Sequence, residues 1–118
     1  MIELRNSPIH GRGVFAIDKI SEGQVVQVAP FLFVYSDDKN EVEGELADYI
    51  FMFSKKRSVL PLLHGALFNH NDDPNLDYTI NGKIKTMTFY ALRDIAANEE
   101  CFIYYGKEYW KSRNLTKK

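Results

Sequence analysis

A dense group of polar side chains, Asn69-His70-Asn71-Asp72-Asp73-Pro74-Asn75, follows an apolar run in this chain. One interpretation is an element end that runs into a loop, because Asn and Asp side chains turn the backbone and Pro74 keeps the residue before it extended. The other interpretation starts from Asn69 and His70, which directly follow the apolar run and should be half buried. Their donors and acceptors then need partners in the protein or in a ligand. A ligand that carries both an amine and a purine would satisfy them.

A second candidate is Gly11-Arg12-Gly13, near the N-terminus. Two glycines around one residue give a backbone with permissive dihedral angles and little side-chain bulk, which allows close approach to a ligand. Without context, such a triplet more often marks a tight turn. The strand-GxGxxG-helix unit of a Rossmann site does not follow it, so a dinucleotide site is not expected.

Metal binding is a further alternative, because histidines and carboxylates occur close together in the middle of the chain. Carboxylates beside Pro74 and Asn75 are more often turn residues, which weakens this hypothesis. The residues concerned are His64, His70, Asp72, Asp73 and Asp77.

Length and composition limit the kind of protein. The chain has 118 residues, of which 45% are hydrophobic and 14% aromatic, so we expect a single domain over residues 1–118. Fifteen basic and sixteen acidic residues give a net charge of −1, so the uniform basic field of a nucleic-acid-binding protein is not expected. Cys101 is the only cysteine, which excludes an internal disulfide and a cysteine-rich zinc site. No segment approaches the roughly 20 apolar residues of a membrane span, so a soluble, intracellular protein without membrane contact is expected.

Most of the chain is predicted to form short strands. Strands are expected over residues 2–5, 24–29 and 31–35, with Pro30 separating the last two, and a surface loop over the acidic residues 36–45. Residues 46–53 could form a helix or a strand, and 54–58 a basic turn. Apolar residues at Leu60, Leu63, Ala66 and Leu67 predict a short helix over residues 60–69.

The clearest local prediction is a β-hairpin, with alternating strands over residues 76–80 and 83–92. The dipeptide Asn81-Gly82 between them is typical of a two-residue type I′ turn. A turn at 98–100 precedes a strand over residues 101–105, Tyr109-Trp110 lies on a last helical turn, and 112–118 forms a basic tail. These patterns together predict a mostly β architecture.

Three separated motifs occur in the order found in SET-domain protein lysine methyltransferases: GRGVFA at residues 11–16, LFNHNDDPN at 67–75 and NEECFIYYG at 98–106. The chain resembles this family over nearly its whole length, and most closely its minimal stand-alone viral histone methyltransferases. The resemblance implies a β-clip fold of several small β-sheets, with short helices and a C-terminal segment threaded under a loop. It also implies a domain without zinc-binding pre-SET or post-SET regions. Departures from the family pattern are Asn71, Asn98 and Tyr104.

The resemblance also implies a reaction, methyl transfer from S-adenosylmethionine to a lysine amine, which must be neutral to act as a nucleophile. Tyr105 matches the family's essential tyrosine and is the expected catalytic residue. The expected cofactor-binding residues are Gly11, Arg12, Gly13, Asn69, His70 and Trp110. The aromatic channel that disfavours the ammonium form is expected to involve Tyr49, Tyr78, Ile103 and Tyr109 as substrate-binding residues. No metal is expected in the site.

The expected substrate is a histone tail, with a role in chromatin regulation and a location in the nucleus, or in the host nucleus if the protein is viral. A homodimer is expected, because a small domain rich in Phe and Tyr leaves sheet surfaces uncovered. Ile103 has no hydroxyl to hold a water beside the amine, which favours the addition of more than one methyl, whereas Tyr78 would favour a single methyl if its ring entered the channel. The alternative function is a SET-like module that binds a peptide tail or the cofactor without turnover.

Overall fold

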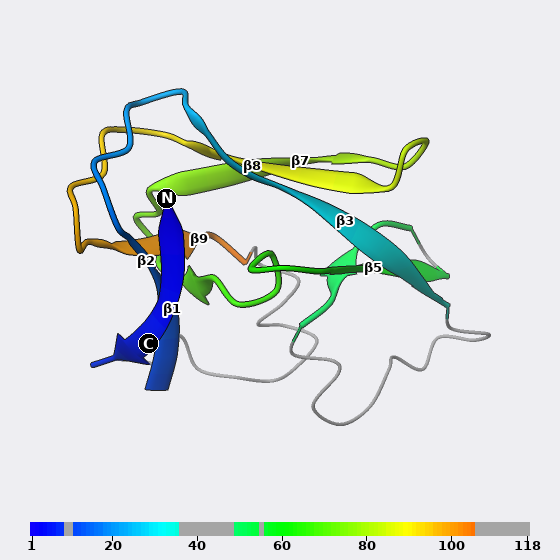
Figure 1. Ribbon diagram of the computed structural model, residues 1–118. Helices are drawn as coiled ribbons and strands as arrows, with labels where there is room; N and C mark the ends of the chain where they lie inside the picture. The colour runs from blue at the N-terminus through cyan, green and yellow to red at the C-terminus, as the bar shows by residue number, and fades with distance from the viewer. Residues whose placement is uncertain (9–10, 36–48, 55, 106–118) are drawn as a thin grey trace.

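The computed structural model describes residues 1–8, 11–35, 49–54 and 56–105, and within these ranges the chain forms nine strands and no helix (Figure 1). The predicted mostly β architecture is therefore confirmed. The expected acidic loop at 36–45, the Tyr109-Trp110 turn, the tail at 112–118 and the threaded C-terminal segment beyond Tyr105 lie outside the described residues. Among those described, no helix has the length and hydropathy needed to cross a membrane.

The first sheet has four strands in the order β1-β2-β9-β6. Strands β1 (Ile2–Ser7) and β2 (Gly11–Ala16) form an antiparallel hairpin, and β2 also pairs antiparallel with β9 (Glu100–Ile103). On its other edge β9 pairs parallel with the short strand β6 (Asn69–His70). This topology places the three motifs of the sequence side by side in one sheet.

The second sheet has five strands in the order β4-β5-β3-β8-β7. Its longest strand, β3 (Val25–Tyr35), pairs first with β8 (Thr86–Ala91) and then with β5 (Arg57–Pro61). The outer strands are β4 (Phe51–Met52), within the segment left open between helix and strand, and β7 (Leu76–Asn81). In Figure 1 strands β7 and β8 of this sheet lie above β2 and β9, and β3 slopes down from them to β5 at the right.

The prediction that Pro30 separates two strands is wrong, because β3 runs through it. Pro30 lies where β3 changes partner, from β8 to β5. Its carbonyl accepts a hydrogen bond from the Leu62 N–H, just beyond the end of β5. A residue at this junction can lack an N–H at little cost to either ladder.

The predicted helix over residues 60–69 is also wrong. Leu60 belongs to β5, and Leu63 has a left-handed φ of 56°, which interrupts any helix. The segment after Leu63 makes successive turns, in which the Gly65 N–H bonds to the Leu62 carbonyl and the Leu67 N–H to that of His64. Helical periodicity in this short segment therefore reflects turns folded onto the core.

The predicted hairpin has the expected strands but a different turn. Asn81 pairs with Thr86, so four residues, and not two, connect β7 to β8. The Asn81 side-chain oxygen accepts the N–H groups of Lys83 and Ile84, and Lys85 supplies a positive φ of 55°. A Cβ on Gly82 would lie 3.0 Å from the Phe53 ring, so contact with a neighbouring strand end shapes the turn.

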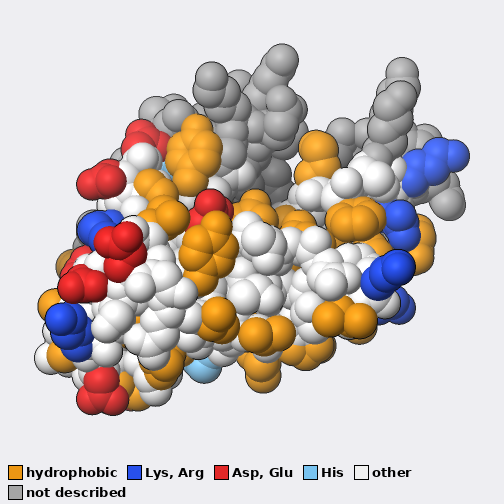
Figure 2. Space-filling view, turned by 90° about the horizontal axis from the view of Figure 1, so that it is seen from above, with side chains coloured by type: hydrophobic (Ala, Val, Ile, Leu, Met, Phe, Trp, Pro, Cys, Tyr) orange, Lys and Arg blue, Asp and Glu red, His pale blue; other side chains and the backbone are white. Residues whose placement is uncertain are grey.

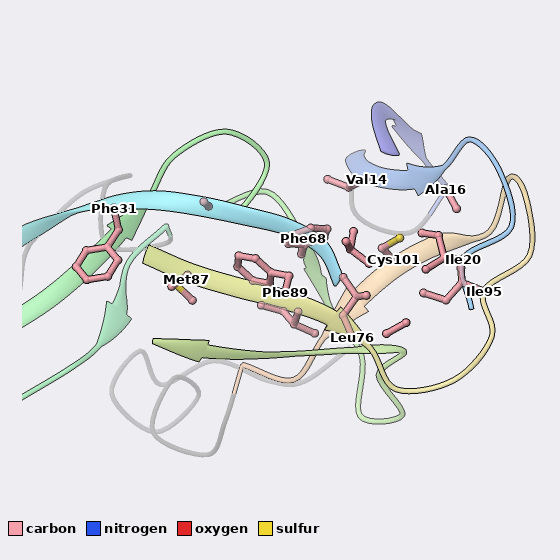
Figure 3. Close-up of a cluster of buried hydrophobic side chains, with 14 of the residues drawn as sticks. Val14, Ala16, Ile20, Phe31, Phe68, Leu76, Met87, Phe89, Ile95 and Cys101 are labelled. Carbon is pink, nitrogen blue, oxygen red and sulfur yellow. The ribbon is translucent and has the colours of Figure 1, made fainter. Parts of the chain in front are cut away.

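The hydrophobic core fills the space between the two sheets (Figure 3). Val14, Ala16 and Cys101 from the first sheet lie near Ile20 and Ile95, whereas Met87 and Phe89 come from the second sheet. Phe68 packs its ring on Phe89 with the centroids 4.8 Å apart. Because Phe68 directly precedes Asn69, burial of its ring anchors the Asn-His segment to the core.

Candidate active site

The parallel pairing of β6 with β9 joins the second and third motifs. Asn69 lies opposite Phe102 and His70 opposite Ile103, and the Asn71 N–H donates to the Ile103 carbonyl. Parallel neighbours distant in sequence cannot be inferred from local pattern, because nothing in either segment specifies the partner.

His70 links this pairing to Tyr105. The buried imidazole accepts the Tyr105 backbone N–H at Nδ1, at 3.0 Å, and its Nε2 lies 2.7 Å from a carboxylate oxygen of Asp72. Since Nδ1 is an acceptor, the proton must be on Nε2, which donates to Asp72. His70 therefore holds the Tyr105 backbone through its side chain and pairs with Ile103 through the β6 main chain.

Tyr105 is half buried, and its hydroxyl donates to the Phe68 carbonyl at 2.7 Å. Its ring lies beside the His70 ring, with centroids 5.3 Å apart. Tyr105 is thus held at two points, by its backbone N–H and by its hydroxyl. A hydroxyl held in this way has one orientation, which is what a group aimed at a reacting atom requires.

Asn69 joins all three motifs through its amide. Its Nδ2 donates to the Arg12 carbonyl at 2.7 Å and to Glu100 Oε2 at 2.8 Å. Both neighbours are pure acceptors, so the amide cannot be flipped without placing oxygen against oxygen. The other amide atom, Oδ1, has no partner among the described residues. Arg12 contributes to this contact through its carbonyl, and its side chain is exposed.

Three buried polar residues, which the sequence analysis did not identify as functional, support this arrangement: Ser7, Asn75 and Glu100. The Ser7 hydroxyl donates to Glu100 Oε1 at 2.9 Å. The Asn75 amide donates to the Glu100 carbonyl at 2.8 Å and accepts the Phe102 N–H at 2.7 Å, so it ties the loop after His70 to β9. The only signal in the sequence was position, since Asn75 and Glu100 lie inside motifs and Ser7 lies four residues before the first one.

The two glycines of the first motif have different roles. Gly11 has a φ of 80°, as expected of a permissive residue, and its added Cβ would meet nothing within 4 Å. At Gly13 a Cβ would collide with Glu100 Oε2 and would lie 2.9 Å from Asn69 Nδ2. Gly13 therefore makes room for a protein carboxylate.

The residues expected around the substrate channel lie in separate parts of the molecule. Ile103 is completely buried in the core. Tyr78 lies on β7, in the other sheet, and packs edge-on against Phe51 at 5.2 Å; burial, and then the charge of Asp77, raise the pKa of its hydroxyl. Tyr49 is half buried just before β4. Tyr109 and Trp110 lie outside the described residues.

The metal alternative gains no support from the geometry. Within the described ranges, no three His, Cys, Asp or Glu side chains gather so that they could hold a metal ion. His64 is instead bound to Gln27, whose amide contacts His64 Nδ1 and accepts the His64 backbone N–H. Asp73 lies in a local turn that begins at Asn71, whose side-chain oxygen accepts the Asp73 N–H.

Cys101, beside Glu100 on β9, is fully buried. Burial, followed by the charges of Glu99 and Glu100, raises the pKa of its thiol from 9.0 to about 12. The thiol is therefore a neutral core group and not a nucleophile.

Comparison with known proteins agrees with this geometry. Residues 11–106 match the family model of the SET domain. The chain is 32% identical over 112 residues to a Schizosaccharomyces pombe histone-lysine N-methyltransferase, H3 lysine-37 specific, covering 92% of this chain and 76% of that protein. It is 30% identical over 81 residues to the Caenorhabditis briggsae histone-lysine N-methyltransferase Suv4-20, covering 67% of this chain but 24% of that protein.

Solved structures show the same fold. A Plasmodium falciparum crystal structure, assigned as a histone methyltransferase, superposes with a TM-score of 0.73 at 28% identity, covering 90% of this chain and 97% of that one. A chain of the ctPRC2 complex superposes with a TM-score of 0.71 at 24% identity, covering 92% of this chain and 15% of that one, and shows the fold alone. The convergence of the three motifs and these similarities establish that the chain belongs to the SET-domain family and is homologous to histone-lysine N-methyltransferases.

Proposed function

We propose that this protein transfers a methyl group from S-adenosylmethionine to the side-chain amine of a lysine in a histone tail. The observation that carries the proposal is the double fixation of Tyr105, by His70 Nδ1 at its N–H and by the Phe68 carbonyl at its hydroxyl. The named relatives are histone-lysine methyltransferases, which supports the substrate class.

The residues present fit a cationic cofactor. The Asn69 side-chain oxygen lacks a partner among the described residues, and the carboxylate of Glu100 lies behind the same amide. An acceptor oxygen backed by negative charge suits an ammonium or a sulfonium group. When bound, S-adenosylmethionine supplies a methyl group on a sulfonium, and a carbon–nitrogen bond forms as the carbon–sulfur bond breaks.

In this proposal the protein positions and desolvates the reacting groups. Asn69, the Arg12 to Gly13 backbone and the His70 main chain bind the cofactor, and Tyr105 and the Phe68 carbonyl direct partial negative charge toward the reaction centre. A lysine amine is mostly protonated in neutral water, so a channel with apolar walls favours the neutral nucleophile. Tyr49, Tyr78, Ile103, Tyr109 and Trp110 stay predictions as residues of the channel and the cofactor site.

The direct test uses purified protein, S-adenosylmethionine labelled in the methyl group, and a mixture of core histones. We expect label on lysine, with the position read by mass spectrometry, and loss of label in Tyr105→Phe. If the protein binds the cofactor but labels no histone or peptide on an array, the non-catalytic module is the correct alternative.

The remaining predictions concern the oligomeric state, the domain organisation and the location of the protein in the cell. We propose a homodimer, because the outer face of the second sheet exposes apolar side chains such as Val28 and Leu32, at 51% and 54%, and Figure 2 shows hydrophobic groups along this face. Light scattering at working concentrations tests it, and a monomer throughout would contradict it. The single-domain organisation, the similarity to minimal viral proteins and a nuclear location stay predictions.

A further inference from the structure

Glu100 is a buried carboxylate that the proposed reaction does not yet use. Its side chain is 8% exposed, at the start of β9, and it accepts hydrogen bonds from Ser7 Oγ and Asn69 Nδ2. Both donors are neutral, and among the described residues no Arg, Lys or His forms an ion pair with Glu100. Burying a carboxylate without a cation costs free energy, because neutral hydrogen bonds replace only part of its hydration.

The position of this carboxylate determines which atom of Asn69 is available. An amide has two N–H donors, and those of Asn69 point to the Arg12 carbonyl and to Glu100. If Glu100 were absent, one of the two acceptors would be lost and the amide could rotate or flip. With Glu100 present, the side-chain oxygen of Asn69 is the atom left for a ligand.

The chain accommodates this carboxylate at a specific position. The place of a Cβ on Gly13 is occupied by Glu100 Oε2, so the glycine of the first motif and the glutamate of the third require each other. Ser7 on β1 and Asn69 on β6 reach the same carboxylate from opposite edges of the sheet. A carboxylate that starts from β9 and is contacted from three other strands, β1, β2 and β6, is placed by the fold and not by a local turn.

We infer that Glu100 is a positioning residue of the cofactor site, which orients the Asn69 amide and supplies the negative charge that favours a positively charged ligand at its oxygen. The inference rests on the proposed function, since S-adenosylmethionine is that ligand. Glu100 acts through Asn69 and through its charge, without itself contacting the reacting atoms. Its loss should therefore weaken cofactor binding much more than it slows the chemical step.

The decisive variant is Glu100→Gln, which keeps the shape and can keep both hydrogen bonds, with its amide donating to Ser7 and accepting from Asn69. Cofactor affinity is measured by calorimetry without substrate, and KM for S-adenosylmethionine and kcat on histone are measured separately. We expect the dissociation constant and KM to rise about tenfold, as for loss of one charge-assisted interaction, with kcat changed less than about threefold.

Two further variants test whether a loss of cofactor affinity in Glu100→Gln is only a structural effect. Glu99→Gln removes the neighbouring carboxylate, which contacts Arg93 at 3.8 Å, and should leave cofactor affinity unchanged. Ser7→Ala removes one donor to Glu100 without changing the charge, and should weaken binding by a smaller factor, about two- to threefold. Ser7→Ala decides the question if Glu100→Gln does not fold.

The outcomes separate this inference from the proposed function. Wild-type protein that neither binds S-adenosylmethionine nor transfers methyl overturns both. Active wild type with Glu100→Gln unchanged in affinity overturns the inference alone. Equal losses in Glu99→Gln and Glu100→Gln, or a fall in kcat with no change in KM, would likewise show that Glu100 does not position the cofactor site.

Discussion

The two sheets of this domain are held together in different ways. In the first sheet, buried or half-buried polar side chains connect segments far apart in sequence, as Asn69, Asn75 and Glu100 do around β9. In the second sheet, long antiparallel ladders and aromatic contacts dominate, with Phe33 packed on Phe31 at 5.2 Å and on Phe53 at 5.4 Å. The first sheet therefore carries the candidate site, and the second packs against it through the hydrophobic core.

The two kinds of interaction respond differently to mutation. Apolar packing tolerates exchange of side chains of similar volume, whereas a buried polar network fails when one member leaves its partners unsatisfied. Mutations in the first sheet should therefore have larger and more specific effects than similar mutations in the second. We expect four effects, from the largest to the smallest, and the first two compare matched positions in the two sheets.

Tyr105→Phe should reduce methyl transfer by about 100-fold or more, because it removes the hydroxyl that we propose lies at the reaction centre. Stability should change by only about 1 kcal/mol, the cost of one hydrogen bond to the Phe68 carbonyl. The matched control is Tyr90→Phe in the second sheet, whose hydroxyl contacts Asp77 at 3.4 Å. Steady-state kinetics should show wild-type turnover for the control, and equal turnover in both variants would remove Tyr105 from the mechanism.

Asn75→Ala should destabilise the fold by about 2–3 kcal/mol, because it leaves the Phe102 N–H and the Glu100 carbonyl buried without their partner. Asn81→Ala in the second sheet is the comparison, because Asn81 is exposed and bonds only to its own turn, so about 1 kcal/mol is expected. Denaturant unfolding measures both. A larger loss for Asn81→Ala would contradict the proposed contrast between the sheets.

Cys101 predicts a loss of stability at alkaline pH. Its pKa is raised to about 12 in the folded protein, so the unfolded chain releases this proton first and folding is favoured less as pH rises above 9. The contribution lost should reach about 2 kcal/mol near pH 10.5, from 1.36 kcal/mol per unit above the unfolded value. Cys101→Ala lacks this term, so the stability difference between wild type and variant should shrink with pH. A constant difference from pH 8 to about 10.5 would show that the folded thiol titrates normally.

Arg57→Met should have the smallest effect, about 0.5–1 kcal/mol. The Arg57 guanidinium lies over the rings of Phe33 and Phe53, at 4.6 and 4.9 Å, so the variant loses cation–π attraction but keeps apolar contact. Lys56→Met, at an exposed neighbour, should lie within about 0.5 kcal/mol of wild type. Losses above about 2 kcal/mol for Arg57→Met would mean that the second sheet also depends on a polar network.

The sequence alone determined the features that depend on near neighbours. Alternation of hydrophobic and polar residues identified β7 and β8. Asn98, with a φ of 69°, turns the chain into β9 as expected. The order of the three motifs identified the family, and the matched residues 11–106 and the all-β fold agree with it. These features are local or lie in the order of short motifs, so they can be read before the chain is folded.

Only the tertiary structure decided what depends on distant partners. Whether Pro30 ends a strand depends on which neighbour β3 pairs with at that point, and the turn at Gly82 depends on Phe53. The functions of Gly13 and Asn75 depend on Glu100 and the rest of β9, which lies more than twenty residues away in sequence from both. Neither residue has a distinctive local sequence pattern. Gly13 leaves room for a side chain from another strand, and Asn75 bonds to backbone groups of another strand that would otherwise lack a partner. In this protein those distant contacts are what hold the Asn-His segment and Tyr105 in one site.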